Sequence, residues 1–494
     1  MFGSLDWLVL VVYWCLSIFI GLYAARSNRS FKDYMLGGSS MPWIPVGISL
    51  IATSVSATTL LGVPADVFDV DMTFIMTNVG CFLSILVVGW LFIPRIRNSG
   101  AQSAYEILEK SFSRSVRRIA AVFYAMHLVL RTGILLFAPS LVLAPILQIP
   151  VWAAILISSV AAIIYTWYGG FKAVVWTDVM QFAVFLGGGI FALFVLANGI
   201  GGFGELSTLA SESGKSHWFN ASLDISNART LLSAGIVYAV LEIAIRGCDQ
   251  QFVQRYLSCK DVKAANRSSI LSMVLGLAVS LLFYWLGAAL FVYYKVKHVS
   301  TLPENLGVND VFPYFIVNSL PSGLTGLLVA AIYAAAMSSI SSAIHALGNT
   351  TEKDILCKAA GQESMFRTKL WIVLWGVCGT FAAFVASSQD GSLLKNALFF
   401  TGLFTGPLLA LFLLSFFATY LRSFSVLGGV VCGMLSLLLF NEIPFEIPFI
   451  PKYTPPLDGV FSWPWNPLIS CTVSVWLALC IDFVVPRKVV DEVA

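Results

Sequence analysis

Ala335-Ala-Met-Ser-Ser-Ile-Ser-Ser-Ala343 carries four hydroxyl side chains within five positions. The segment lies inside a stretch, 322–351, that contains no Asp, Glu, Lys or Arg. This stretch is long enough to cross a bilayer as a helix, which needs roughly 20 predominantly apolar residues. Because residues three and four apart share one face of a helix, Ser338 aligns with Ser341 and Ser342. The pattern predicts either a site for a small hard cation, which prefers oxygen ligands, or a close contact between two membrane helices.

The composition of the chain indicates the class of protein. Of its 494 residues, 58% are hydrophobic and 11% are charged, whereas soluble domains carry about 25% charged residues. The mean hydropathy is +0.85. We therefore predict an all-α integral membrane protein that forms a single membrane domain over residues 1–494. The net charge of +3 is too small to indicate a nucleic-acid partner.

Apolar ranges along the chain predict about thirteen transmembrane helices. The ranges are 7–25, 45–65, 72–94, 119–145, 151–171, 179–199, 230–250, 268–294, 323–347, 370–389, 396–420, 424–440 and 464–485. Lys and Arg concentrate in alternate connections such as 353–369, and connections of this kind face the cytoplasm. This bias predicts a multi-pass protein of the cell (inner) membrane with its N-terminus outside and its C-terminus in the cytoplasm. The long polar connections 200–228 and 296–322 and an irregular Pro-rich loop at 442–464 are then outside, and a short inner helix is expected at 105–110.

Ionisable residues within the apolar ranges are candidates for function, because a charge inside a membrane is costly. Arg131 lies in the middle of the fourth range, where a structural charge partner is the alternative role. Asp178 directly precedes the sixth range, and a carboxylate there can also simply stabilise the start of a helix. Glu242 and Arg246 are four residues apart in the seventh range and can pair with each other.

Hydroxyl and small residues interrupt the second apolar range, Ile48-Ser-Leu-Ile-Ala-Thr-Ser-Val-Ser-Ala-Thr-Thr-Leu-Leu-Gly62. Such an interruption predicts a broken membrane helix. Carbonyl groups released at a break bind cations, and the freed helix ends orient polar substrates. The alternative is an intact helix in which Ser and Thr hydroxyls bond back to the preceding turn.

Four motifs in this order resemble the solute:sodium symporter family, and the resemblance covers essentially the whole chain. The motifs are Ser49-Leu-Ile-Ala-Thr-Ser-Val-Ser56, Gly170-Phe-Lys-Ala-Val-Val-Trp-Thr-Asp-Val179, Gln254-Arg-Tyr256 and Ala335-Ala-Met-Ser-Ser-Ile-Ser-Ser342. The resemblance implies a LeuT-type fold of two inverted five-helix repeats. The implied divisions are an extra N-terminal helix in 1–30, a first repeat at 45–199, a second repeat at 230–420 and two C-terminal helices in 424–485.

The resemblance also implies where sodium would bind. The sodium site shared within the family would use carbonyl groups of Ala52, Val55 and Ala335 and hydroxyl groups of Ser338 and Ser339. A second sodium site, which some members have, is matched by Asp178, Ser338, Ser341 and Ser342. One or two Na⁺ per cycle are therefore expected as coupling ions.

The pocket pattern most similar to this chain is that of the bacterial sodium/sialic acid symporters, although the loops at 41–45 and 56–66 also look like the monocarboxylate branch. The matching substrate positions are Ser54, Ser56, Thr59, Phe74, Asn78, Arg131, Tyr238 and Glu242. Arg131 corresponds to the arginine that binds a carboxylate in that pattern. Glu242 departs from the pattern, where an Asn stands, and either pairs with an arginine or contacts the substrate.

Together, these implied residues predict a sodium-coupled symporter that imports a small organic solute by alternating access. A guanidinium group binds a carboxylate through two parallel hydrogen bonds, which favours an organic anion such as sialic acid. A neutral sugar or a monocarboxylate is the alternative substrate, and a non-transporting solute sensor is the alternative function. We expect no enzyme activity, because no catalytic constellation stands out. The expected partners are the solute, sodium ions and the lipid bilayer, with the oligomeric state left open.

Overall fold

The structure is a computed structural model, and it describes residues 2–26, 29–304, 306–357, 362–387, 393–441 and 455–485. All regular secondary structure in these ranges is helical, as the sequence predicts. The longer helices are α1 (Ser4–Ala25), α3 (Trp43–Ser54), α4 (Ala57–Asp69), α5 (Thr77–Val87), α8 (Arg114–Leu147), α9 (Val151–Ile200), α11 (Tyr238–Cys248), α13 (Val262–Phe291), α15 (Leu324–Thr350), α16 (Met365–Ser387), α17 (Leu393–Phe417), α18 (Ser423–Ser436) and α19 (Asn466–Val484). The shorter helices are α2 (Phe31–Leu36), α6 (Ile93–Asn98), α7 (Glu106–Ser111), α10 (Phe203–Glu212), α12 (Gln250–Ser258) and α14 (Val311–Asn318).

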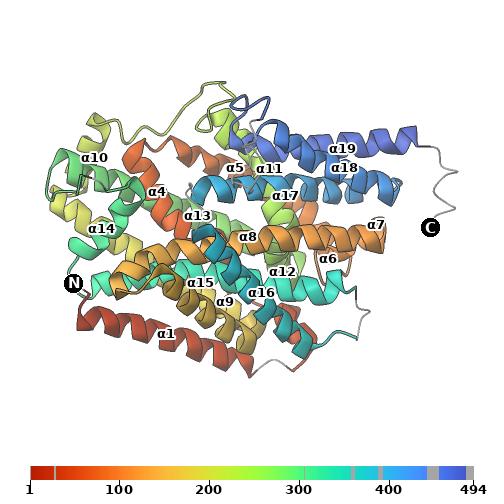
Figure 1. The fold of residues 1–494 in the computed structure, drawn as a ribbon, viewed down its shortest axis with the longest axis horizontal. Helices are drawn as coiled ribbons and strands as arrows, with labels where there is room; N and C mark the ends of the chain where they lie inside the picture. Colours follow the sequence, from red (N-terminus) through yellow and green to blue (C-terminus); the bar gives the residue numbers. More distant parts are fainter. Residues whose placement is uncertain are drawn as a thin grey trace.

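The long helices form the bundle expected of a membrane protein. The described residues of each of the thirteen apolar ranges lie mainly in helices, and α1, α8, α15 and α19 run along the long axis of the molecule (Figure 1). Within the described ranges, nine helical segments are long and apolar enough to cross a membrane, and the bent pair α3–α4 makes a tenth. Two further apolar segments, Thr401–Phe417 and Ser423–Leu439, are shorter.

The second apolar range is a broken helix. The axes of α3 and α4 differ by 55°, and between them Val55 and Ser56 have extended backbone angles. The backbone N–H of Ser56 reaches the hydroxyl of Thr59 at 3.5 Å, at the start of α4. The hydroxyls of Thr53 and Ser54 instead donate to carbonyls of the preceding turn, as Ser and Thr do within membrane helices. The predicted break is therefore present, and it lies at two residues within the hydroxyl-rich run.

Helix α9 changes direction at Gly170, near the end of the fifth apolar range. Gly170 has φ 63° and ψ −165°, a conformation that is essentially restricted to glycine. A side chain at this position would require backbone angles that L-residues avoid. The glycine thus ends the first half of α9 and directs the second half, which carries Asp178, back into the bundle.

Helix α15, which carries the four serines, is the buried centre of the bundle. It contacts α9, α8, α16, α1 and α3, and Figure 1 shows it among these helices. Its most apolar 18-residue window is 94% buried. The alanines and serines of 334–343 have small side chains, which allow neighbouring helices to approach closely. Both expectations for this stretch, a polar site and close packing, are therefore compatible in one helix.

The connections between the long helices are partly helical themselves. The predicted inner helix at 105–110 is α7, and the polar connections 200–228 and 296–322 contain α10 and α14. The Nζ of Lys215, which follows α10, donates to the carbonyls of Phe68, Asp69 and Val70 at 2.9, 3.0 and 2.8 Å. This lysine therefore caps the C-terminal end of α4. Residues 442–454 of the predicted Pro-rich loop lie outside the described residues.

Candidate functional site

The break between α3 and α4 meets α15 at a set of backbone carbonyls and serine hydroxyls. The hydroxyl of Ser338 donates to the carbonyl of Ala52 at 2.9 Å and to that of Ala335 at 3.1 Å. The hydroxyl of Ser339 also donates to the carbonyl of Ala335, at 3.3 Å. Val55 lies in the break itself, outside both helices. The structure thus brings together Ala52, Ala335, Ser338 and Ser339 of the predicted first sodium site, with Val55 three residues along the chain from Ala52.

This junction has the chemistry of a site for a small hard cation. Its polar atoms are hydroxyl and carbonyl oxygens. When a serine hydroxyl turns its hydrogen away from a carbonyl, the lone pairs of both oxygens can face one bound ion. Oxygen ligands of this kind suit hard cations, whereas transition metals favour nitrogen and sulfur. The described part of the chain holds no cluster of three or more His, Cys, Asp or Glu side chains that could bind a metal.

A second polar cluster surrounds Asp178 on α9, whose side chain is fully buried. Its Oδ2 accepts hydrogen bonds from the hydroxyl of Ser49 at 2.5 Å and from Nη2 of Arg255 at 2.8 Å. The same Nη2 donates to the hydroxyl of Ser342 at 2.6 Å. Asp178 and Ser342 of the predicted second sodium site are therefore linked through a guanidinium group. The hydroxyl of Ser341 donates to the carbonyl of Ser338 at 3.1 Å, within α15.

Arg255 and Ser49 belong to this cluster but were not predicted as site residues. Both occur in motifs that carried the family resemblance, so a signal existed. Arg255 lies on α12, however, 77 residues from Asp178 in the sequence, and a charge in a short connecting helix resembles an ordinary interfacial arginine. Nothing in the spacing of the sequence predicts that α12 turns its arginine into the bundle.

The predicted substrate positions fall into three groups. Ser54, Ser56 and Thr59 lie at the break between α3 and α4. Phe74 and Tyr238 both pack against Trp463, with ring centroids 6.0 and 5.9 Å away. Trp463 was not predicted, because it lies at the end of the Pro-rich segment 442–464, which was expected to be an irregular loop.

Asn78, Glu242 and Arg131 make different contacts. The Nδ2 of Asn78 donates to the hydroxyl of Ser280 on α13 at 2.8 Å. Glu242 accepts from Nε of Arg246 at 2.7 Å and from the hydroxyl of Tyr238 at 3.1 Å, so its arginine partner is Arg246 and not Arg131.

Arg131 itself is half-buried on α8. It forms no hydrogen bond or ion pair with another residue in the described part of the chain, although it attracts the buried Asp249 electrostatically. Its guanidinium group is therefore available to an external carboxylate.

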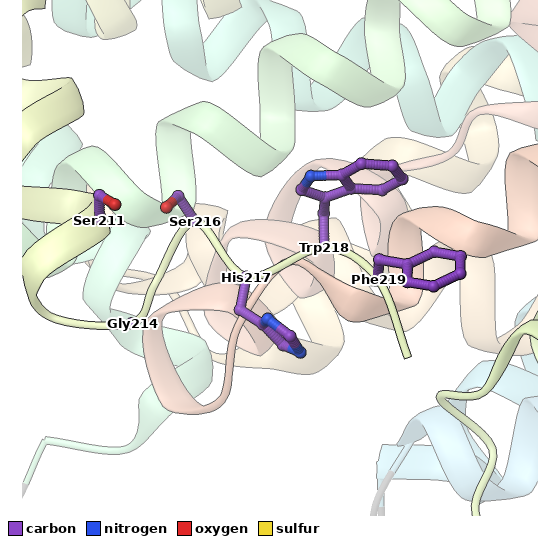
Figure 2. A pocket seen from close by; sticks show the side chains of 6 residues that line it. All are labelled: Ser211, Gly214, Ser216, His217, Trp218 and Phe219. Carbon is purple, nitrogen blue, oxygen red and sulfur yellow. The ribbon is translucent and has the colours of Figure 1, made fainter. Parts of the chain in front are cut away.

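A hollow of about 560 Å³ elsewhere on the molecule is distinct from these clusters. Figure 2 shows that its lining comes from the end of α10 and the segment that follows it, with Trp218 and Phe219 at one end. None of the predicted site residues lines it.

The chain is similar to known proteins over most of its length. Residues 34–433 match the family model described as "Sodium:solute symporter family". The sodium/sialic acid symporter SiaT of Proteus mirabilis is 30% identical over 451 residues, which cover 88% of this chain and 89% of that protein. The sodium-coupled monocarboxylate transporter 1 of Mus musculus is 31% identical, over 92% of this chain and 75% of that protein. A solved structure of a Na⁺-coupled sialic acid symporter in its substrate-bound outward-open state superposes with a TM-score of 0.86 and 27% identity, over 98% of this chain and 99% of that one.

Proposed function

Because this chain belongs to the sodium:solute symporter family, we propose that it imports a small organic carboxylate, with sialic acid as the first candidate, together with one or two sodium ions by alternating access. The observation that carries this proposal is the junction of Ala52, Ala335, Ser338 and Ser339. It joins the broken helix to α15 through oxygens that a sodium ion can use. Sodium bound there would favour the conformation in which these helices are held together.

The coupling of ion and solute follows from this arrangement. A ligand shifts a conformational equilibrium only by the difference between its affinities for the two states. Sodium at the junction would fix the orientation of α4, and with it Ser54, Ser56 and Thr59 at the break. The solute would then bind to side chains that are already in position. By linkage, the solute would raise the affinity for sodium by the same factor by which sodium raises the affinity for the solute.

The available guanidinium group of Arg131 supports an anionic substrate. A carboxylate would form two hydrogen bonds with its planar fork and neutralise its charge. We assign Phe74 and Tyr238 to an aromatic wall and Asn78 to a polar contact with the same solute. Glu242 is already paired with Arg246, so we propose that it supports the hydroxyl of Tyr238 without neutralising Arg131.

A monocarboxylate is the second candidate substrate, and the similarity to the mouse monocarboxylate transporter favours it. A neutral sugar would use the hydroxyl and amide groups but would leave Arg131 without a partner. We further propose that the protein is a transporter without enzyme activity. We propose an N-terminus outside and a C-terminus in the cytoplasm, with repeats at about 45–199 and 230–420.

Thermal stability of the purified protein tests this function directly. The solute panel is sialic acid, lactate, glucose, galactose and proline, each measured in sodium and in potassium. We expect sialic acid to raise the melting temperature in sodium and to have no effect in potassium. A shift with lactate alone would select the monocarboxylate, and a shift with a sugar alone would contradict the role of Arg131. Sodium-driven uptake into vesicles then separates a transporter from a sensor, which would bind the solute without moving it.

A further inference from the structure

The carboxylate of Asp178 already has a cation beside it. Arg255 donates from Nη2 to Asp178 at 2.8 Å, from Nε to the hydroxyl of Ser49 at 2.8 Å and from Nη1 to the carbonyl of Gln251 at 2.8 Å. Its side chain is 1% exposed and that of Asp178 is fully buried. The guanidinium group also lies 5.9 Å from the centre of the Phe171 ring. This arginine is therefore held on several sides, and its charge compensates that of the carboxylate.

The same oxygens are those that the second sodium site would need. Asp178 and Ser342 are both predicted ligands, and both accept a hydrogen bond from Nη2 of Arg255. The other carboxylate oxygen, Oδ1 of Asp178, is buried and has no hydrogen-bond partner. A buried acceptor without a partner is costly, so this oxygen is the point at which a sodium ion would attach. The cluster thus has one oxygen open to an ion and one already committed to the guanidinium group.

We propose that Arg255 competes with sodium for the Asp178 carboxylate and thereby sets how weakly the protein binds a second sodium ion, an inference that rests on the proposed sodium symport. With Arg255 in place, the pair of side chains is neutral, and an added sodium ion leaves the cluster with a net charge of +1 inside the membrane. Without the guanidinium group, one sodium ion makes the cluster neutral. The difference is electrostatic, so it depends on the charge of residue 255 more than on its shape.

The predicted first sodium site has no direct contact with Arg255. Its oxygens come from Ala52, Val55, Ala335, Ser338 and Ser339, and none of these residues contacts Arg255 in the hydrogen bonds that the described residues form. Ser338, as a predicted member of both sites, is the connection between them. Two classes of sodium site with different affinities are the expected result.

Equilibrium binding of radioactive sodium to the purified full-length protein tests the competition. The variants are Arg255→Gln, which removes the charge, Arg255→Lys, which keeps it, and the double variant Arg255→Gln with Asp178→Asn. We expect the wild type to bind one sodium ion tightly and a second one weakly. In Arg255→Gln the second ion should bind roughly 5- to 150-fold more tightly, the range of ordinary coupling between sites. The Arg255→Lys variant should resemble the wild type, and the double variant should lose the gain.

The outcomes separate this inference from the proposed function. If the wild type binds sodium and Arg255→Gln binds it with the same affinities, the symporter stands and the competition is overturned. Two sodium ions of equal affinity in the wild type also overturn it, and that measurement needs no variant. If neither protein binds sodium, the proposed function fails together with the inference. A gain in Arg255→Lys equal to that in Arg255→Gln would show that shape and not charge is responsible, which also contradicts the proposal.

Discussion

Ser338 links the broken helix to α15 by hydrogen bonds. Its hydroxyl reaches carbonyls on both sides, those of Ala52 and Ala335, at 2.9 and 3.1 Å. It is 1% exposed, and its hydroxyl is a predicted ligand of sodium but not of the solute. Loss of this hydroxyl should therefore affect the ion more than the choice of solute.

The variant Ser338→Ala should raise the sodium concentration for half-maximal uptake on the order of 10-fold, because one oxygen ligand is lost. The preference among solutes should stay the same. Sodium titration of uptake into proteoliposomes measures both quantities. Ser140→Ala is a matched control, since the buried Ser140 hydroxyl bonds to Leu136 in its own helix, away from the junction. Unchanged sodium activation in Ser338→Ala would remove this residue from the site.

Replacement of Arg131 should weaken binding of the solute and leave binding of sodium unchanged. Arg131→Ala should raise the KM for a carboxylate by about 10- to 100-fold, the cost of a hydrogen bond to a charged group. Arg131→Lys keeps the charge but loses the bidentate fork, so its KM should lie between those of the wild type and of Arg131→Ala. Sodium-dependent thermal stability of both variants checks that the first sodium site is intact. Normal uptake of an acid by Arg131→Ala would contradict the carboxylate assignment.

At this scale, the sequence predicted individual residues better than their partners. Ser338, Ser339 and Asp178 were recognised as candidates, and the structure finds them buried. The partner of Asp178 could not be predicted, because Arg255 approaches from another helix. The partner of Glu242 could be predicted from the sequence, because Arg246 lies four residues away on the same helix. The two side chains form the ion pair that this spacing favours.

Helix α4 is held at both ends by different means. Its N-terminal end emerges from the break at Val55 and Ser56, and its C-terminal carbonyls accept from the Nζ of Lys215. Burial lowers the pKa of Lys215, and the ring of Phe291 lies 4.3 Å from its ammonium group. The break was predictable from hydroxyl residues inside an apolar run. The cap was not, because nothing in the sequence distinguishes this lysine of the 200–228 connection from a solvated one.

The variant Lys215→Met should loosen the outer half of the broken helix. The three carbonyls at the end of α4 would lose a charged donor, which costs about 1.5–3 kcal/mol in local stability. Hydrogen exchange of the amides in 57–69 should therefore become faster. Lys297→Met is the control, because Lys297 pairs with Glu205 at an exposed site worth about 0–1 kcal/mol. Equal exchange of 57–69 in both variants and in the wild type would contradict the cap.

The contact between α7 and α8 should make stability depend on pH. The hydrogen bond from Arg117 holds the pKa of Glu109 below its usual range, with a further contribution from Arg114. A carboxyl group whose pKa is lower in the folded protein stabilises the fold above its ordinary pKa of about 4.3. This stabilisation disappears as the pH falls through the lowered pKa.

Glu109→Gln should therefore lower the free energy of unfolding at pH 7 by about 1 kcal/mol. As the pH falls from 5 through the lowered pKa of Glu109, the variant should lose less stability than the wild type. Melting temperatures of the purified protein across this interval provide the measurement. Arg117 retains its hydrogen bond to Asp354 at 2.8 Å in the variant, so the surrounding contact persists. Parallel pH profiles for the two proteins would exclude Glu109 as the titrating group.

For the whole molecule, the apolar ranges predicted the helices because a lipid environment imposes a strong and simple pattern. Every spanning helix must be apolar over a fixed length, and the described residues of each of the thirteen ranges lie mainly in helices. The directions of those helices depend on local backbone conformations such as that of Gly170, and on contacts between distant segments. The packing of Trp463 against Phe74 and Tyr238 is a contact of the second kind, and the pattern of hydrophobic residues contains no information about it.

The pairing of buried charges has a consequence for how the protein responds to membrane voltage. Asp178 is neutralised by Arg255 and Glu242 by Arg246, and the proposed first sodium site contains no fixed charge. The charge that crosses the membrane in each cycle is therefore that of the sodium ions and the solute. One sodium ion with a singly charged acid would move no net charge, and its uptake would not respond to voltage. One sodium ion with a neutral sugar would move one charge, which is worth about 2.3 kcal/mol per 100 mV. Once the number of sodium ions per cycle has been measured, an electrode therefore reports the charge of the solute before its chemical identity is known.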